Sequence, residues 1–200
     1  MTQPRVAGLL LAAGRGRRFA ALAPRDKLLE PLDGEPVALH ACRALAAGCG
    51  LTVAVVGPHA AGPLREALLA GGARLVVADD ADLGMGHSLA AGARAMVAEG
   101  LADALMVLPA DMPWLRAQTV RTVAAAAARA GAAGLVVPAL VDGRRGHPVA
   151  FGAAHFAALG RLRGDRGARS LLETLPASVV TVDDPGILRD VDTPSDLTPP

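Results

Sequence analysis

The chain has 200 residues, 52% of them hydrophobic, and a formal net charge of +1 at pH 7. This length and composition fit one folded domain with a sizeable core and exclude an intrinsically disordered chain. The near-neutral charge and the lack of Tyr argue against nucleic-acid binding, which relies on basic patches and stacking aromatic side chains. No apolar run is long enough to span a membrane, and two cysteines are too few for a disulfide framework, so we expect a cytoplasmic protein.

Short apolar runs alternate with helical segments over the first 138 residues. The runs at 6–12, 51–56, 74–78, 103–108 and 135–138 predict buried strands, and helices are predicted at 36–47, 63–70, 87–99 and 118–130. This alternation predicts an α/β fold of three layers, with helices on both faces of a mostly parallel, twisted sheet.

The pattern changes after residue 138. A turn at 142–146 leads to an extended run at 147–151, followed by helical segments at 153–159 and 168–173 and a strand at 178–182. Near the end, Thr193 and Pro194 predict the cap and the first residue of a last helix. The sequence has no linker or internal repeat, so residues 1–200 are predicted to form a single domain, in which 139–177 is an elaboration on the side of the second substrate.

Three loops of this fold are expected to lie together. Right-handed crossovers place the loops that follow parallel strands on one edge of the sheet, where ligands of such folds bind. These loops are residues 14–27, 57–62 and 109–113. The binding site is therefore predicted at the carboxyl ends of the strands.

The loop at 14–27 contains the only lysine of the chain, Lys27. Gly14 and Gly16 allow its backbone to turn tightly and to present N–H groups to anionic oxygens. The loop also carries three arginines whose guanidinium groups suit phosphate oxygens: Arg15, Arg17 and Arg18. Because arginine supplies almost every other cation, Lys27 is interpreted as a compact ammonium that a site requires. Alternatively, Lys27 is a lysine left by chance in a biased composition, and the Gly/Arg loop is an ordinary strand-to-helix turn with solvated arginines.

Two common phosphate-binding fingerprints are missing from this loop. The pattern G-x-G-x-x-G would need glycine at the position of Phe19, and the Walker pattern would need Gly-Lys-Ser or Gly-Lys-Thr. The sequence also lacks a Gly-x-Ser-x-Gly elbow, a His-Glu-x-x-His motif and paired-cysteine metal spacing. Nothing in the sequence therefore supports these other enzyme classes.

The opening LAAGRGRRF, followed by KLLEPLDGEPV, resembles the start of the MobA-like nucleotidyltransferases. Five further segments resemble that family in order along the chain: GMGHSL at 84–89, PADMP at 109–113, GHPV at 146–149, GDRGAR at 164–169 and DVDTPSDL at 190–197. The resemblance implies a Rossmann-like fold of the nucleotide-diphospho-sugar transferase type. The last three segments resemble the branch that makes molybdopterin cytosine dinucleotide from CTP and the molybdenum cofactor.

The resemblance also implies roles for charged residues. Arg18 is expected to contact the triphosphate and Lys27 to lie near the α-phosphate, and both are expected to be catalytic together with Asp111. Asp111 is expected to bind Mg²⁺, which prefers oxygen ligands; Asp190 and Asp192 are candidates for the second ligand, and Asp192 is chosen. A different interpretation makes Asp111 the N-cap of the following helix, and the two later acids a solvated end that caps the last helix.

Nucleotide binding is expected mainly from loop backbone. The predicted nucleotide site consists of Leu11, Ala12, Ala13, Gly14, Arg15, Gly16, Arg18, Lys27, Gly57 and Ser88. The resemblance implies that Ala-Ala-Gly goes with cytosine and Ala-Gly-Gly with guanine, so Ala13 favours CTP over GTP. Physically, the Cβ of Ala13 narrows the space for a purine. A plain helix cap is the other interpretation of Ser88.

The second substrate is expected to bind the later segments of the chain. The predicted residues are His147, Asp165 and Arg169, and the arginines Arg144, Arg145 and Arg166 offer further cations for a phosphate. Alternatively, His147 is an exposed histidine in a turn, and the arginines form a solvated face.

The sequence departs from the family pattern between Arg18 and Lys27, where the segment 19–26 is longer and lacks the usual glycine. The function implied is a Mg²⁺-dependent transfer of the CMP part of CTP to the phosphate of the molybdenum cofactor, a molybdopterin, with a target molybdoenzyme as a further partner. The alternatives are a sibling enzyme that uses GTP or a sugar or alcohol phosphate, and a non-catalytic chaperone that carries the pterin cofactor.

Overall fold

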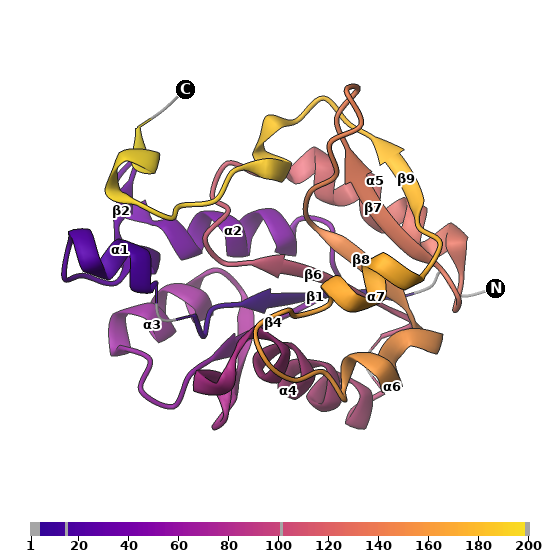
Figure 1. Cartoon of the computed structure of the whole chain (residues 1–200), viewed down its shortest axis with the longest axis horizontal. Helices are drawn as coiled ribbons and strands as arrows, with labels where there is room; N and C mark the ends of the chain where they lie inside the picture. The colour runs from indigo at the N-terminus through magenta and orange to yellow at the C-terminus, as the bar shows by residue number, and fades with distance from the viewer. Residues whose placement is uncertain (1–4, 15, 101, 199–200) are drawn as a thin grey trace.

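A sheet runs through the middle of the molecule in this computed structural model, which describes residues 5–14, 16–100 and 102–198 (Figure 1). Within these residues the sheet has seven strands in the order β5-β4-β1-β6-β8-β7-β9. The strands are β1 Val6–Leu11, β4 Leu51–Val56, β5 Ala73–Val77, β6 Ala104–Pro109, β7 Leu135–Ala139, β8 Val149–Gly152 and β9 Ser178–Thr181. All neighbouring strands pair in parallel except β8, which is antiparallel to β6 and to β7.

Helices cover both faces of this sheet, which confirms the predicted three-layer, mostly parallel α/β fold. The helices are α1 Arg17–Leu22, α2 Val37–Ala46, α3 Gly62–Ala70, α4 Met85–Ala98, α5 Ala117–Ala130, α6 Phe156–Leu159 and α7 Arg169–Thr174. Buried residues of α2, α3 and α5 pack on one face, and those of α4 and α6 pack on the other. No helix in the described part of the chain is long and apolar enough to cross a membrane.

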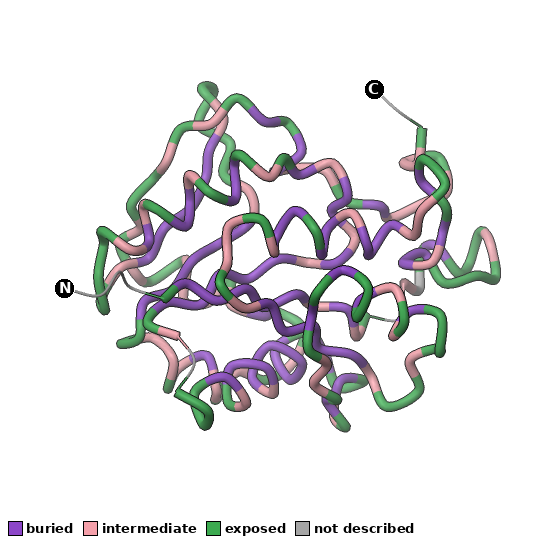
Figure 2. The backbone as a smooth tube through the Cα atoms, turned by 180° about the vertical axis from the view of Figure 1, so that it is seen from behind, coloured by how far each residue is buried: buried purple, intermediate pink, exposed green. Residues whose placement is uncertain are grey.

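Consecutive side chains of a strand point to opposite faces of the sheet, so a central strand contributes to the core on both faces. In β1, Leu9 and Leu10 are both 0% exposed, yet Leu9 packs in the cluster that contains Leu89 of α4, and Leu10 packs in the cluster that contains Leu45 of α2. A continuous apolar run is therefore what a central strand of this sheet requires. Figure 2 shows this buried backbone in the centre of the molecule and the exposed backbone in the outer loops.

One glycine decides how closely α4 approaches the sheet. A Cβ at Gly92, in the middle of α4, would lie 2.4 Å from Cδ1 of Leu9 and 2.6 Å from Cγ2 of Val55. A larger residue there would force the side chains of Leu9 and Val55, or the helix itself, to move. The loop at the start of α4 is thereby held close to the strand ends.

The segment between β1 and α2 differs from the prediction of an uninterrupted loop at 14–27. It contains helix α1, the 3-10 helix η1 Lys27–Leu29 and, beyond it, a small hairpin of β2 Pro31–Leu32 and β3 Glu35–Pro36. The turn of the hairpin places Asp33 at φ 50° and Gly34 at φ 83°, a conformation that Asp-Gly sequences favour.

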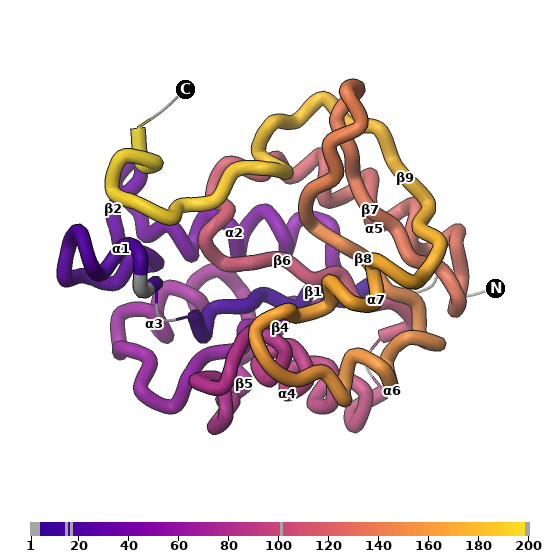
Figure 3. The backbone as a smooth tube through the Cα atoms, in the orientation of Figure 1, coloured from indigo at the N-terminus to yellow at the C-terminus, as the bar shows by residue number. Residues whose placement is uncertain are grey.

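The C-terminal segment returns across the molecule to this region. After β9 it passes through the 3-10 helices η4 Pro185–Leu188 and η5 Pro194–Leu197, and its yellow trace ends beside β2 and α1 (Figure 3). Val191 of this segment is 0% exposed in a small cluster with Phe19, Leu32 and Val37. Residues from the two ends of the chain are thus brought together beside the strand ends.

Candidate active site

The loops after β1, β4 and β6 meet at one edge of the sheet, as predicted. Leu11 at the end of β1 is in register with Pro109 at the end of β6, and the N–H of Ala110 donates to the carbonyl of Leu11 at 3.0 Å. On the other side, the N–H of Ala12 donates to the carbonyl of Val55 at 2.8 Å. The chain therefore places its glycine-rich loop between the loop of Gly57 and the loop of Asp111.

Lys27 is the first residue of η1, and its side chain reaches into this edge of the sheet. Its Nζ lies 2.5 Å from Oδ2 of Asp111 and 3.6 Å from Oδ1 of Asp192, and it donates to the carbonyl of Val191 at 2.8 Å. Lys27 is only 9% exposed. A buried ammonium with two hydrogen bonds, to a carboxylate and to a carbonyl, and a second carboxylate close by is firmly positioned.

Gly16 leaves room for the stem of this lysine. Gly16 has φ 53°, in the left-handed region, and precedes α1. A Cβ there would lie 3.3 Å from Cγ of Lys27. Both the backbone conformation and the close contact therefore favour glycine at position 16.

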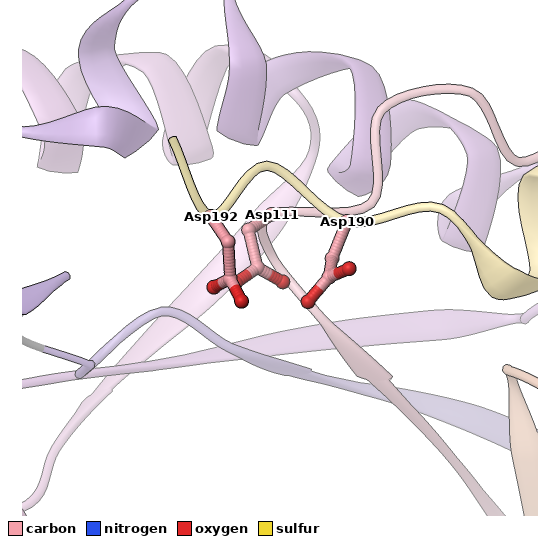
Figure 4. A group of neighbouring side chains, drawn as sticks. All are labelled: Asp111, Asp190 and Asp192. Carbon is pink, nitrogen blue, oxygen red and sulfur yellow. The ribbon is translucent and has the colours of Figure 1, made fainter. Parts of the chain in front are cut away.

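Three carboxylates surround the position where Lys27 ends. One carboxylate oxygen of each of Asp111, Asp190 and Asp192 lies within 4.8 Å of the others, and the three side chains point into the same space (Figure 4). Among the described residues, Oδ1 of Asp111 is buried without a hydrogen-bond partner. Partial burial raises the pKa of Asp190, and the charges of Asp111 and Asp192 raise it further. An unpaired buried carboxylate oxygen beside two more carboxylates is a donor set that fits a hard divalent cation.

The capping interpretations of Asp111 and Asp192 are wrong. Helix α5 begins at Ala117, so Asp111 is six residues upstream and caps no helix. At the chain's end, Asp196 and not Asp192 forms the capping box with Thr193. The side chain of Asp192 instead contacts Lys27 and accepts a hydrogen bond from Arg18.

Helix α1 and the C-terminal segment hold the Arg18–Asp192 pair together. Phe19, next to Arg18, is 0% exposed and belongs to the cluster that contains Val191, next to Asp192. The N–H of Val191 also donates to the carbonyl of Asp111 at 2.8 Å. The lengthened segment at 19–26 thus anchors one side of the site through an apolar contact.

Two clefts open on the side of the glycine-rich loop. The first has a volume of about 350 Å³ and is lined by Leu11, Ala13, Gly14, Ala81, Asp82, Gly84, Met85, Ser88, Pro109, Asp111 and Asp165. The second, of about 330 Å³, is lined by Ala12, Ala13, Gly14, Asp26, residues 57–61, Leu64 and Asp82. The two clefts therefore bring together six of the predicted nucleotide residues: Leu11, Ala12, Ala13, Gly14, Gly57 and Ser88, the last buried in the first turns of α4. Gly16, Arg18 and Lys27 line neither cleft. Arg15 lies outside the described residues.

Two further clefts lie on the side of β8 and α7. The third has a volume of about 460 Å³, and its lining includes Arg145, His147, Phe151, Arg166 and Arg169. The fourth, of about 330 Å³, connects Arg145 and His147 with Asp111 and Asp190. Met85 and Pro109 line the first, third and fourth clefts, so Asp111 and Asp190 lie between this second pair and the first two clefts. The first two are called the nucleotide-side clefts below, because predicted nucleotide residues line them.

The predicted acceptor residues divide between these clefts. His147 and Arg169 line the third cleft, whereas Asp165 lines the first, beside Gly14 and Ser88. His147 is half-buried rather than exposed, its Nδ1 has no hydrogen-bond partner among the described residues, and burial lowers its pKa, so the ring is neutral at neutral pH.

Only one arginine of the predicted acceptor group has no ion pair in the described part of the chain. Arg144 pairs with Asp142, and Arg166 and Arg169 both pair with Glu173. Arg145 has none and lines both the third and the fourth cleft.

Sequence reasoning gave no role to Met85 or Val191. Met85 lies within the GMGHSL segment but carries no ionisable group, and Val191 contacts Lys27 through its carbonyl, which every residue possesses. Only the position of Val191 between two acids could have drawn attention to it.

Comparison with known proteins adds to this geometry. Residues 8–179 match the family described as the MobA-like NTP transferase domain. The chain belongs to the MobA-like NTP transferase family. It is 31% identical over 211 residues to the purine catabolism protein PucB of Bacillus subtilis (strain 168), covering 98% of this chain and 96% of PucB. This MobA-like chain is accordingly a nucleotidyltransferase, with a nucleoside triphosphate as substrate.

Solved structures agree with this assignment. A crystal structure of Rv0371c from Mycobacterium tuberculosis H37Rv superimposes with a TM-score of 0.78 at 30% identity, covering 98% of this chain and 96% of that one. The complex of Rv0371c with manganese gives a TM-score of 0.73 at 25% identity, with 96% and 95% covered. A nucleotidyl transferase from Methanothermobacter thermautotroptrophicus gives 0.77 at 28% identity, with 96% and 94% covered.

Proposed function

We propose that the chain is a Mg²⁺-dependent molybdenum cofactor cytidylyltransferase, which transfers the CMP part of CTP to the terminal phosphate of molybdopterin and releases pyrophosphate. The observation that carries this proposal is the position of Lys27. Its ammonium lies among the carboxylates of Asp111 and Asp192, beside the glycine-rich loop. A positive charge fixed there is suited to a triphosphate whose α-phosphorus is attacked from the side of the fourth cleft.

The reaction forms one bond and breaks another. An oxygen of the acceptor's terminal phosphate attacks the α-phosphorus of CTP, and the bond from that phosphorus to the bridging oxygen breaks, so that pyrophosphate leaves with the electron pair. Lys27 and Arg18 stabilise the negative charge that develops on the phosphate oxygens, and the loop at Gly14 and Gly16 orients the triphosphate. Catalysis is thus mainly positioning and charge stabilisation.

Asp111 and Asp192 are proposed as the ligands of Mg²⁺, with Asp190 close enough to join them. When bound, the ion supplies positive charge to the phosphate oxygens of the nucleotide. Two observations support this assignment: Oδ1 of Asp111 is buried without a partner among the described residues, and the relative Rv0371c has been solved in complex with manganese.

The choice of CTP rests on the second cleft. Ala13 lines both nucleotide-side clefts, so its Cβ reduces the room for a base between the glycine-rich loop and the loop at Gly57. A smaller pyrimidine suits this space better than a purine. Leu11, Ala12 and Ser88 complete the proposed nucleotide site.

We propose that the acceptor binds in the third and fourth clefts. His147 and Arg169 are proposed to hold it, with Arg145 at the junction of the two clefts and Asp165 at the edge toward the nucleotide. These residues come from 139–177, which supports the proposal that this region is the acceptor side of a single domain. A cytoplasmic location and delivery of the product to a molybdoenzyme are part of the same proposal.

The test is pyrophosphate release with each of the common nucleoside triphosphates, with and without molybdopterin and Mg²⁺. We expect release only when CTP, molybdopterin and Mg²⁺ are all present. Faster turnover with GTP would overturn the base assignment, and turnover with a sugar or alcohol phosphate in place of molybdopterin would overturn the acceptor. Binding of the pterin without release of pyrophosphate from any nucleotide would identify a chaperone instead.

A further inference from the structure

We propose that Arg65 is a positioning residue for the nucleotide: it fixes the backbone of residues 57–61, which form one wall of the second cleft. This inference rests on the proposed function, because it treats that cleft as the site of the nucleobase. Arg65 itself does not line either nucleotide-side cleft. It would therefore act through the loop and not by touching the nucleotide.

The side chain of Arg65 donates to three carbonyl groups of this one loop. Its Nε donates to the carbonyl of Ala60 at 3.1 Å, and its Nη2 donates to the carbonyls of Gly57 and Pro58, both at 3.3 Å. A planar guanidinium can serve several acceptors at once with a single geometry, whereas an ammonium cannot span them in the same way. The three bonds therefore hold the loop in one shape.

The three hydrogen bonds from Arg65 to the loop, called the clamp below, start from a helix that is fixed to the core. Arg65 belongs to α3, whose Leu64 and Leu68 are 2% and 0% exposed in the main hydrophobic cluster. A helix anchored in this way cannot move without disturbing the core. The position of the loop is thus tied to the sheet through Arg65 and α3.

The clamp also decides which backbone groups are left for a ligand. The carbonyls of Gly57, Pro58 and Ala60 accept from Arg65, and the carbonyl of Ala61 accepts from the N–H groups of Leu64 and Arg65. Within the described residues, the N–H groups of His59 and Ala61 have no acceptor. With four of the five carbonyls of residues 57–61 already accepting hydrogen bonds and two N–H groups unpaired, the loop favours a base edge that presents acceptors, such as O2 and N3 of cytosine.

The test uses two variants and one matched control in the full-length protein. Arg65→Met removes the clamp, and Arg65→Lys keeps the charge without the planar fork. Arg94→Met is the control, because Arg94 also donates from a helix to a backbone carbonyl, that of Gly160 at 2.8 Å, but lines no nucleotide-side cleft. For each protein we would measure CTP binding with Mg²⁺ by equilibrium dialysis, the KM and kcat of transfer, and hydrogen exchange of residues 57–61 without nucleotide.

We expect Arg65→Met to raise the Kd and KM for CTP by about tenfold and to change kcat by no more than about twofold, because the lost bonds order the loop and not the reacting atoms. Exchange at 57–61 should become faster, Arg65→Lys should fall between the wild type and Arg65→Met, and Arg94→Met should match the wild type. An unchanged Kd, or unchanged exchange at 57–61, overturns the role of Arg65 while leaving the proposed function intact. A wild-type protein that binds no nucleoside triphosphate overturns both.

Discussion

The Nζ of Lys27 lies 2.5 Å from Oδ2 of Asp111, so the only lysine of the chain is paired with the central carboxylate of the proposed metal site. A divalent cation bound by Asp111 and Asp192 would compete with this ammonium for the same oxygens. In the proposed mechanism, this pair therefore links the charge that acts on the triphosphate to the affinity of the site for metal.

Replacing Lys27 by Met should separate these two effects. We expect turnover to fall by about a hundredfold or more, because a fixed positive charge at the α-phosphate is lost. In the absence of nucleotide, Mn²⁺ should bind about tenfold more tightly, because a competing cation is removed from the carboxylates. Electron paramagnetic resonance titration of Mn²⁺ measures the second effect. Arg43→Met, which breaks the exposed pair with Glu35, is the control and should change neither quantity.

Removing the ring of Phe19 should weaken the apolar contact that holds α1 to the C-terminal segment beside the site. Because Phe19 is fully buried in the cluster that contains Val191, Phe19→Ala is expected to lower the free energy of unfolding by about 3–5 kcal/mol. Turnover should fall as well, since Arg18 and Asp192 flank that contact. Leu22→Ala is the matched control: Leu22 lies on the same helix but is 68% exposed, and its loss should cost no more than about 0.5 kcal/mol. Urea unfolding curves that coincide for the two variants would disprove the anchoring role.

Arg145 should contribute more to acceptor binding than its neighbour Arg144. Arg145 lines the third and fourth clefts without an ion pair among the described residues, whereas Arg144 is paired with Asp142. We expect Arg145→Met to raise the KM for the acceptor by about tenfold, because a charge-assisted hydrogen bond to phosphate is lost. Arg144→Met should have little effect. Equal changes in acceptor KM for both variants would indicate a general effect of surface charge.

The raised pKa of Asp190 predicts how the stability of the folded protein changes with pH. Its pKa in the folded protein is raised above the ordinary value of 3.8, so the folded state binds the proton more tightly than the unfolded state. Stability contributed by this proton is present below pH 3.8 and is lost as the pH rises through the folded pKa. In metal-free protein, Asp190→Asn should therefore raise the melting temperature at neutral pH and lose this advantage in acid. A lower melting temperature at neutral pH would show that Asp190 is stabilising there.

Much of the sheet follows from local patterns in the sequence. The run at 51–56 coincides with β4, because each of its residues can be buried on a parallel sheet and glycine follows directly. The direction of β8 did not follow, because pairing with β6 and β7 depends on residues far apart in the chain. Local periodicity carries no information on such a partner.

Several side chains of the candidate site could be named from the sequence, but their arrangement in space could not. The segments with Lys27, Asp111 and Asp192 were identified from the sequence, and the structure places these side chains together. Helix α1 was missed because it has six residues and no side-chain cap, and is stabilised by the burial of Phe19. The hairpin of β2 and β3 had a signal in Asp33-Gly34 that could have revealed it. Contacts to backbone carbonyls, such as those of Arg65 with its loop and of Lys27 with Val191, leave no such signal.

The most direct test of the proposed reaction follows the phosphates of CTP. Wild-type protein would be incubated with Mg²⁺, molybdopterin and CTP that is radiolabelled at either the α- or the γ-phosphate. We predict that the α-label appears in the pterin product and the γ-label in pyrophosphate, and that Lys27→Met lowers the rate of both by about a hundredfold or more. Transfer of the γ-label to the pterin, or release of pyrophosphate that is unaffected by Lys27→Met, would contradict the assignment of this site.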